Sequence, residues 1–419
     1  MNRLQNLARS PYLLLIPILL LAWLLRLPDM TTAGHVDDML YFNAPWARGI
    51  QRHGLFSVYA TTPGVDYPPI FLTILWLTSS LAAPFRGAGL SLQFTVLTKF
   101  FSVAAELLLI ALLYAKLPPA RNIRWLLPLL FALSPGLIAV SAFWGQTDSI
   151  LTLLLVLSIF ALNRRQSRRA WLWFALALLM KFQAIVLLPM LGLLSLRRFG
   201  LWRTLQSIAL AFALLVLLYL PFILTSGYDP AMRPYGGAVD LYPFVTANAH
   251  NLWYIAYPQL WSQPAHQLND VPLDTLITIF DMTASRVGFL LLFLTVAIIA
   301  VRLWRDAHQP LEFVWAAALY LAFFLLPTQI HERYIYPAAV LALIAVAQDR
   351  RFWPIAAGLA VTCAYNIVVV PRLHFVWLGL DLPAFFGNIA LWVALANLIL
   401  FFWLLALLIR PALHSHRRR

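Results

Sequence analysis

The sequence predicts an all-α polytopic membrane protein with about twelve transmembrane helices, on the strength of its composition and its hydrophobic pattern. Hydrophobic residues make up 62% of the 419 positions and charged residues 11%, and the mean hydropathy is +0.80. Soluble globular chains carry about 25% charged residues, so a water-soluble enzyme is excluded. The apolar stretches are continuous and do not alternate with polar residues, which excludes a transmembrane β-barrel. The single cysteine, Cys363, excludes an intrachain disulfide and a cysteine-based metal site.

Ten apolar runs are clear along the chain. The first follows Arg3 and Arg9 and ends at Arg26 and Pro28 without a small-residue cleavage pattern, so we expect an uncleaved first helix rather than a signal peptide. The ten runs cover residues 12–27, 92–114, 125–143, 149–162, 205–224, 287–301, 313–326, 334–347, 352–370 and 389–409.

Two further segments are ambiguous. Residues 170–196 form one helix of about 40 Å if straight, but both flanks are rich in arginine and therefore belong on the cytoplasmic side. We expect this segment to turn back on itself in two arms that are each too short to span the membrane, with Lys181 and Gln183 at an apex inside the outer half of the membrane. Residues 69–83 are bounded by prolines, and a crossing there would leave Lys116 outside, so we place them along the outer interface.

With these choices both termini are cytoplasmic, and 20 of the 30 basic residues lie inside beside three acids. The net charge of +14 is then a topology signal, and we expect no nucleic-acid partner. We expect one integral membrane domain over residues 1–419. External segments cover residues 28–90, which carry the interfacial helices, and residues 226–284, so function is expected on the outer face.

Two acids, Asp37 and Asp38, follow the first helix. A partly buried carboxylate at this depth can act as a general base. Asp is also a favoured N-cap residue, and both roles can hold if Asp37 caps a helix while Asp38 faces a cavity. His35 beside these acids is weak evidence for a metal site.

Two more polar groups stand at the expected outer face. Asp66 and Tyr67 precede two prolines; a helix start explains the prolines but not Asp66. Gln146 and Asp148 follow Trp144, and Asp148 either caps the next helix or forms, with Gln146, the polar floor of a cavity.

Basic residues could bind an anion there. Lys181, with Gln183 beside it, is costly at membrane depth unless it is paired or solvated, so a function is favoured over a snorkelling side chain. His331 and Arg333 can bind a phosphate, although Glu332 and Arg333 could be an ordinary surface pair.

The second external segment contains amides and aromatic rings suited to a hydroxylated ligand, although loop packing also explains the tryptophan. They are Asn248, His250, Asn251 and Trp253. Glu106, inside an apolar run, is expected to be a buried hydrogen-bond partner without a chemical role.

A carboxylate and three cations, Lys181, His331 and Arg333, suit an amphiphilic substrate with a phosphate at the interface and a lipid tail in the bilayer. Polyprenyl-phosphate sugars fit this description. Asp38 would deprotonate an acceptor hydroxyl, and the cations would stabilise the departing phosphate. One base without a covalent intermediate implies inversion at the anomeric carbon.

The chain resembles the GT-C superfamily of polyprenyl-phosphate-sugar-dependent glycosyltransferases. In particular, it is similar to bacterial mannosyltransferases related to the GPI mannosyltransferases, and to the glucosyltransferases that extend dolichol-linked oligosaccharides. The motifs that carry the resemblance, in order, are Asp37-Asp38, Trp46-Ala47, Asp66-Tyr67-Pro68-Pro69, Gly145-Gln146 with Asp148, Lys181 with Gln183, Asn248 to Trp253, and His331-Glu332-Arg333-Tyr334.

This resemblance implies that the acid of the first external loop is the catalytic base and that basic residues near the hairpin and in the His-Glu-Arg segment hold the donor phosphate. The spacing from Asp38 to Trp46 is one residue longer than the family pattern, so Asp37 remains a candidate beside the preferred Asp38. The resemblance also implies that no metal is needed, and we expect no cofactor.

We therefore expect an inverting hexosyltransferase of a bacterial-type inner membrane, with its active site on the outer side. The donor is a polyprenyl-phosphate mannose or glucose, the acceptor is a lipid or glycan, and membrane lipids surround the helices. A secondary transporter and a lipid-linked-sugar polymerase or ligase are the alternatives. A transporter typically shows paired repeats with broken helices, a ligase a large late loop, and neither is evident here.

Overall fold

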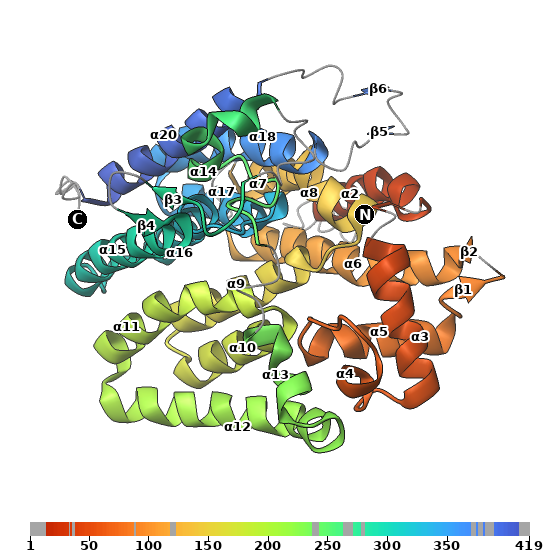
Figure 1. The fold of residues 1–419 in the computed structure, drawn as a ribbon. Coiled ribbons are helices and arrows are strands. Elements are labelled where there is room, and N and C mark those ends of the chain that lie inside the picture. Colours follow the sequence, from red (N-terminus) through yellow and green to blue (C-terminus); the bar gives the residue numbers. More distant parts are fainter. Residues whose placement is uncertain are drawn as a thin grey trace, which may run out of the picture.

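The computed structural model describes residues 14–32, 34–35, 38–87, 89–117, 123–236, 243–262, 271–277, 281–369, 374–375, 380–381 and 389–409. Helices dominate this part of the chain, and three two-residue strand pairs accompany them (Figure 1). Asp37, Arg3 and Arg9 lie outside the described residues, so what was predicted for them stays a prediction.

The first part of the chain contains one long helix on each side of a group of short ones. A π-helix, η1, follows α2, and a β-hairpin precedes α6, which Ser91 caps by accepting a hydrogen bond from the Phe94 amide. The elements are α2 (Leu15–Met30), η1 (Asp38–Asn43), α3 (Ala44–His53), α4 (Val58–Thr61), α5 (Pro69–Leu81), β1 (Phe85–Arg86), β2 (Gly89–Leu90) and α6 (Leu92–Lys116). The predicted interfacial segment 69–83 thus forms a helix, α5, that begins at Pro69.

The middle part contains a bent pair and a hairpin of helices. Pro135 cannot continue α7, and the chain bends by 53° before the next helical segment. The elements are α7 (Ile123–Leu133), α8 (Pro135–Ile138), η2 (Ala139–Trp144), α9 (Asp148–Asn163), α10 (Ser167–Met180), η3 (Phe182–Leu187), α11 (Leu188–Phe199), α12 (Leu201–Ser226) and α13 (Tyr228–Gly236).

The last part supplies the buried centre of the molecule. Thirteen of the fourteen residues of α16 are buried, as expected for a helix that is apolar on every side, and α17 packs along it. The elements are α14 (Leu252–Ala256), η4 (Pro258–Ser262), β3 (Leu276–Ile277), β4 (Met282–Thr283), α15 (Ala284–Arg305), α16 (Glu312–Leu325), η5 (Glu332–Ile335), α17 (Tyr336–Gln348), η6 (Arg350–Phe352), α18 (Trp353–Val369), β5 (His374–Phe375), β6 (Leu380–Asp381) and α20 (Ala390–Ile409).

The turn inside residues 170–196 is confirmed. The Trp171 indole donates a hydrogen bond to the Ser195 hydroxyl at 3.0 Å, so the two ends of the segment lie side by side. The chain reverses at Lys181, whose backbone is extended between α10 and η3. The second arm, Phe182–Phe199, is nevertheless long enough by itself to count as a possible crossing, whereas both arms were expected to be too short.

The apolar helices make this an all-α membrane protein. Five helices of the described chain are long and apolar enough to cross a bilayer, or six if the bent pair is one crossing. Several central helices, α9, α16 and α17 among them, have 13–16 residues, fewer than the roughly 20 that a crossing needs. The count of twelve crossings therefore stays a prediction.

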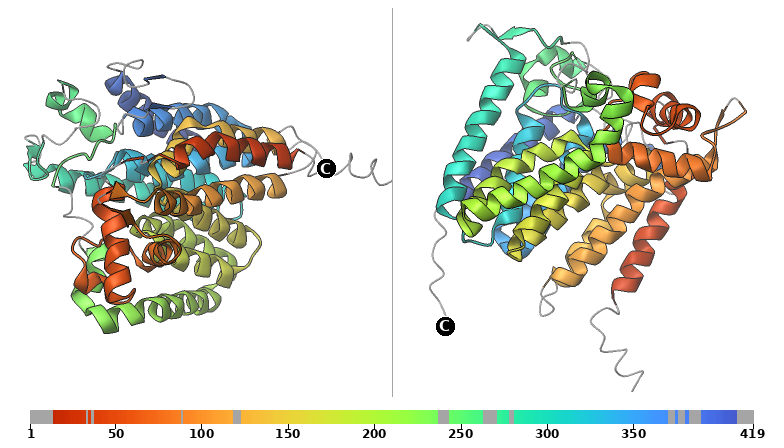
Figure 2. Two further views of the ribbon diagram at one scale, coloured as in Figure 1. Left: turned by 90° about the vertical axis from the view of Figure 1, so that its right-hand side faces the viewer. Right: turned by 90° about the horizontal axis from the view of Figure 1, so that it is seen from below.

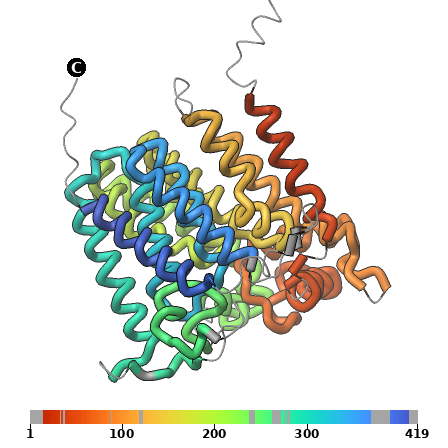
Figure 3. The backbone as a smooth tube through the Cα atoms, turned by 90° about the horizontal axis from the view of Figure 1, so that it is seen from above, coloured from red at the N-terminus to blue at the C-terminus, as the bar shows by residue number. Residues whose placement is uncertain are grey.

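The two segments that the sequence assigns to the outer face meet at one end of the helix bundle. Figure 3 and the right-hand view of Figure 2 show α3–α5 and α13–α14 gathered at that end, while the long helices run side by side away from it. The Ser226 hydroxyl donates to the Phe56 carbonyl at 2.8 Å, and the rings of Tyr59 and Tyr219 stack. The segments thus pack on the bundle and on each other.

Glu106 is the buried hydrogen-bond partner that the sequence predicts. It accepts hydrogen bonds from Arg26 Nε at 2.6 Å, from the Ser141 hydroxyl at 2.7 Å and from the Tyr336 hydroxyl at 2.5 Å. Arg26 and Glu106 are fully buried. This ion pair joins α2 to α6, and its hydrogen bonds extend to η2 and α17.

We predict that Arg26→Met destabilises the protein by about 3–5 kcal/mol, because it leaves the Glu106 carboxylate buried without its charged partner. Thermal unfolding of the purified protein in detergent measures the change. As a matched control, Arg351→Ala removes an exposed pair with Asp349 and is expected to cost about 1 kcal/mol or less. Equal losses in the two variants would contradict this account.

Candidate functional site

Asp38 begins η1 and points at the η2–α9 turn. Its Oδ2 accepts hydrogen bonds from Trp144 Nε1 at 2.6 Å and from Gln146 Nε2. The residue at the N-cap of α3 is Asn43, and its side chain makes no capping bond. Asp38 therefore does not cap α3, and part of its side chain, 22%, stays exposed; that it faces a cavity stays a prediction.

The amide of Gln146 is oriented from both ends. Its Oε1 accepts a hydrogen bond from the Tyr67 hydroxyl at 3.1 Å, so its NH₂ group is the end that faces Asp38. Gly145 before it has φ 77°, a left-handed conformation that glycine adopts without strain. The turn thus presents an indole N–H and an amide N–H to one carboxylate oxygen.

Lys99 packs against the turns that precede Asp38 and Gln146. It was not identified as a site residue from the sequence. Its buried Nζ donates to the carbonyls of Asp29 and Thr32 at 3.0 Å each. A Cβ added at Gly145 would lie 2.8 Å from Lys99 Cγ, and one at Gly34 would lie 2.9 Å from its Nζ. One lysine therefore touches both turns that carry the site. A lysine inside the apolar run 92–114 was the signal that could have revealed it.

Asp66 lies among the same charges. Burial raises its pKa from the usual 3.8 to about 6; its own backbone hydrogen bond and the charges of Arg333 and Lys181 pull this pKa down, and Asp38 pushes it up. Its Oδ1 is buried without a hydrogen-bond partner in the described part of the chain. Asp66 thus carries a carboxylate that a polar ligand could satisfy.

Lys181, at the hairpin apex, forms a buried ion pair with Asp148. Lys181 Nζ lies 2.9 Å from Asp148 Oδ1 and 5.0 Å from the centroid of the Tyr334 ring. The capping role considered for Asp148 is not found, since α9 begins at Asp148 itself and Thr147 is its N-cap residue. Gln183 follows in η3, buried, and its carbonyl accepts from the Tyr320 hydroxyl at 3.2 Å.

Arg333, in the His331–Arg333 segment, joins the residues described so far into one cluster, which consists of Asp38, Asp66, Trp144, Gln146, Asp148, Lys181 and Arg333. Arg333 Nη1 donates to Glu332 Oε1 at 3.1 Å, and its guanidinium carbon lies 5.1 Å from the centroid of the Trp144 ring. The Glu332 carboxylate is 1% exposed and the Arg333 side chain 11%, so the interpretation as an ordinary surface pair is wrong. Arg333 reaches the indole that also binds Asp38.

Burial and neighbouring charges shift the pKa values of two side chains in this segment. Burial raises the pKa of Glu332, but hydrogen bonding and charge from His331 and the charge of Arg333 outweigh it and hold this pKa at about 2. Burial, followed by the charge of Arg333, lowers the pKa of His331. This lowering disfavours the charged imidazole; the part of His331 in binding a donor phosphate stays a prediction.

The motif at residues 248–253 contacts the cluster at one end. Asn248 and His331 form a β-bridge, and Asn248 is left-handed with φ 66°. His250 is fully buried against Asn366, with Nδ1 and the amide oxygen 3.0 Å apart. Asn251 caps α14, and the Trp253 indole donates to the Leu326 carbonyl at 2.9 Å. The recorded contacts of the last three stabilise the fold, and their contact with substrate stays a prediction.

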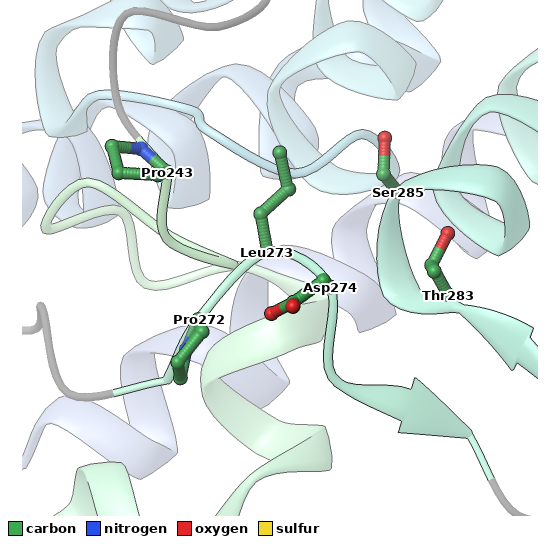
Figure 4. A pocket seen from close by; sticks show the side chains of 6 residues that line it. All are labelled: Pro243, Pro272, Leu273, Asp274, Thr283 and Ser285. Atoms are coloured by element: carbon green, nitrogen blue, oxygen red, sulfur yellow. The ribbon is translucent and has the colours of Figure 1, made fainter.

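A hollow at the surface lies apart from these residues. It has a volume of about 420 Å³ and is lined by Pro243, Pro272, Leu273, Asp274, Thr283 and Ser285 (Figure 4). The cluster contributes none of these lining residues. The lining of the hollow holds one carboxylate and no cation, so it does not suit an anionic ligand. We therefore place the candidate site at Asp38. In the described part of the chain no three His, Cys, Asp or Glu residues lie together as a metal site would require; the expectation of a metal-free site stays a prediction.

The fold and this cluster define the class of the protein: an all-α membrane protein with paired carboxylates and cations at one end of its bundle. Residues 59–235 match the family model of the ALG3 protein. This stretch is less than half of the chain and includes Asp66, Gln146, Asp148 and Lys181. The match supports a glycosyltransferase family that uses lipid-linked sugars. No curated protein matches the chain.

We predict that Asp66→Asn stabilises the protein at neutral pH. Because the folded pKa is about 6 and the usual value is 3.8, the folded state binds this proton more tightly, and stability falls as the pH rises from about 4 to 6. The asparagine variant lacks that loss, so its melting temperature should exceed that of the wild type at about pH 7.5 and converge with it at lower pH.

Thermal unfolding in detergent across this pH range measures the effect, with Asp274→Asn at an exposed carboxylate as the control. If Asp66→Asn is no more stable than the wild type at neutral pH, ionisation of Asp66 does not destabilise the folded protein.

Proposed function

We propose that the protein is an inverting GT-C hexosyltransferase that moves mannose or glucose from a polyprenyl phosphate to a hydroxyl of a lipid or glycan acceptor. The proposal rests on the environment of Asp38. Its Oδ2 accepts hydrogen bonds from Trp144 and Gln146, while part of its side chain stays exposed. A carboxylate fixed in this way can accept a proton from an acceptor hydroxyl without first reorienting.

Asp38 acts as the base in this proposal. The acceptor oxygen attacks the anomeric carbon as its proton passes to the carboxylate, and the bond from that carbon to the phosphate oxygen breaks with its electron pair on the phosphate. A single displacement of this kind inverts the anomeric carbon. Fixed positive charges stabilise the departing phosphate because they need no reorganisation during the reaction.

Arg333 and Lys181 supply those charges, and each already has a carboxylate partner, Glu332 or Asp148. The partners make it possible to keep both cations buried. Arg333 Nε is buried without a hydrogen-bond partner among the described residues, so the guanidinium retains a donor for a phosphate oxygen. His331 adds a hydrogen-bonding group.

The proposed location is a bacterial-type inner membrane, with the site on the outer side and both termini in the cytoplasm. The support is the distribution of charge along the sequence together with the contact between the two polar connecting segments. The sugar and the relationship to the bacterial and GPI-related branches are part of the proposal.

We predict that Asp38→Asn lowers kcat by about 10²–10⁴-fold, the usual contribution of a general base, because an amide cannot accept the proton. The assay measures sugar transfer from short-chain polyprenyl-phosphate mannose or glucose to extracted lipid acceptors. Asp274→Asn, at an exposed carboxylate away from the cluster, should keep full activity. Full activity in Asp38→Asn would remove the base assignment.

We predict that Arg333→Ala weakens donor binding at least tenfold, since a charge-assisted hydrogen bond to phosphate contributes about 1.5–3 kcal/mol. Binding of a polyprenyl-phosphate sugar to the detergent-solubilised protein measures the affinity. Arg233→Ala serves as the control because Arg233 is exposed on α13. Unchanged donor affinity in Arg333→Ala would exclude the proposed phosphate site.

A further inference from the structure

The two oxygens of the Asp38 carboxylate have different surroundings. Oδ2 accepts two N–H donors, from Trp144 and Gln146. Oδ1 faces the imidazole of His35, whose Nδ1 lies 3.7 Å away. A proton taken up by Asp38 therefore belongs on Oδ1, because the lone pairs of Oδ2 are directed at groups that can only donate.

His35 is held in place for contact with that oxygen. Its ring stacks on the Trp144 ring with centroids 4.8 Å apart and 20° between the planes. Gly34 before it has φ 66°, and a Cβ there would collide with the Phe143 carbonyl. The Met39 amide donates to the His35 carbonyl at 3.3 Å. The turn and the stack together fix the ring beside Asp38.

The imidazole joins a buried atom to the surface. Its Nδ1 is buried and has no hydrogen-bond partner in the described part of the chain, whereas 26% of the side chain is exposed. The exposed part therefore belongs to the other side-chain atoms, and Nε2 is not among the buried atoms that lack a hydrogen-bond partner. A neutral imidazole can accept a proton on one nitrogen and release one from the other, so the ring can pass a proton from Asp38 to water.

We propose that His35 is the second member of an Asp38–His35 dyad that carries the acceptor's proton out of the site, an inference that rests on the glycosyltransferase function proposed above. The acceptor O–H bond breaks as its oxygen bonds to the anomeric carbon, and the proton moves to Asp38 Oδ1. It then passes to His35 Nδ1, and the proton on Nε2 leaves to water. Asp38 returns to its ionised form, and proton exchange with water restores the starting tautomer of the imidazole before the next turnover.

The distance of 3.7 Å is longer than a hydrogen bond. Hydrogen bonds between catalytic groups are often long before the substrate binds and shorten in the reacting complex. Protonation of Asp38 also favours a shorter distance to His35 Nδ1, because the new O–H group otherwise has no acceptor in a partly buried site.

The test uses two substitutions that separate proton transfer from packing. His35→Phe keeps an aromatic ring against Trp144 but removes both nitrogens, and His35→Ala leaves space for free imidazole. We expect kcat to fall about tenfold or more in both variants, with the KM for donor within about twofold of wild type. Added imidazole should raise the kcat of His35→Ala in proportion to its concentration and leave His35→Phe unchanged.

His53→Ala is the matched control because His53 is exposed at the end of α3 in the same segment; it should keep the wild-type kcat and show no response to imidazole. Wild-type kcat in His35→Phe, or failure of imidazole to raise the kcat of His35→Ala, overturns the dyad. If Asp38→Asn is inactive while His35→Phe is fully active, the dyad fails and the transferase function stands. If the wild type transfers sugar from neither donor, the function itself fails.

Discussion

Charged groups in apolar surroundings need partners from the protein itself, and this constraint organises the molecule. A buried charge without a partner costs several kcal/mol, and three buried ion pairs of the bundle join residues that lie far apart in sequence. Arg26 binds Glu106, Arg198 binds Glu312, and Lys181 binds Asp148. These pairs draw together elements that apolar packing alone would leave free to slide.

Much of the architecture could be predicted from the distribution of charge. Arginines on both flanks of residues 170–196 predict a reversal, and the Trp171–Ser195 hydrogen bond confirms it. Glu106 inside an apolar run predicts a buried partner, and the structure provides three. The number of crossings is harder to predict, because a run of apolar residues looks alike whether lipid or other helices surround it, as α16 illustrates.

The sequence identified candidate site residues but not the hydrogen bonds and ion pairs that they form. Asp38, Asp66, Asp148, Lys181 and Arg333 do gather at one end of the bundle, yet their roles depend on neighbours that no local pattern reveals. An aspartate at the start of a helix predicts an N-cap whether or not a lysine lies beside it in the fold, as Lys181 does at Asp148. The lowered pKa of His331 likewise follows from burial beside Arg333, which spacing along the chain cannot show.

The position of Lys99 has a mechanical consequence. Its ammonium group ties down the carbonyls that end α2, and its methylene stem fills the space beside Gly145. The turn before Asp38 and the turn before Gln146 therefore both pack against the Lys99 side chain. Replacing Lys99 by a shorter residue would loosen both turns at once, so the Asp38 carboxylate and the Gln146 amide would lose their alignment together. Any redesign of either turn has to begin by preserving the lysine underneath.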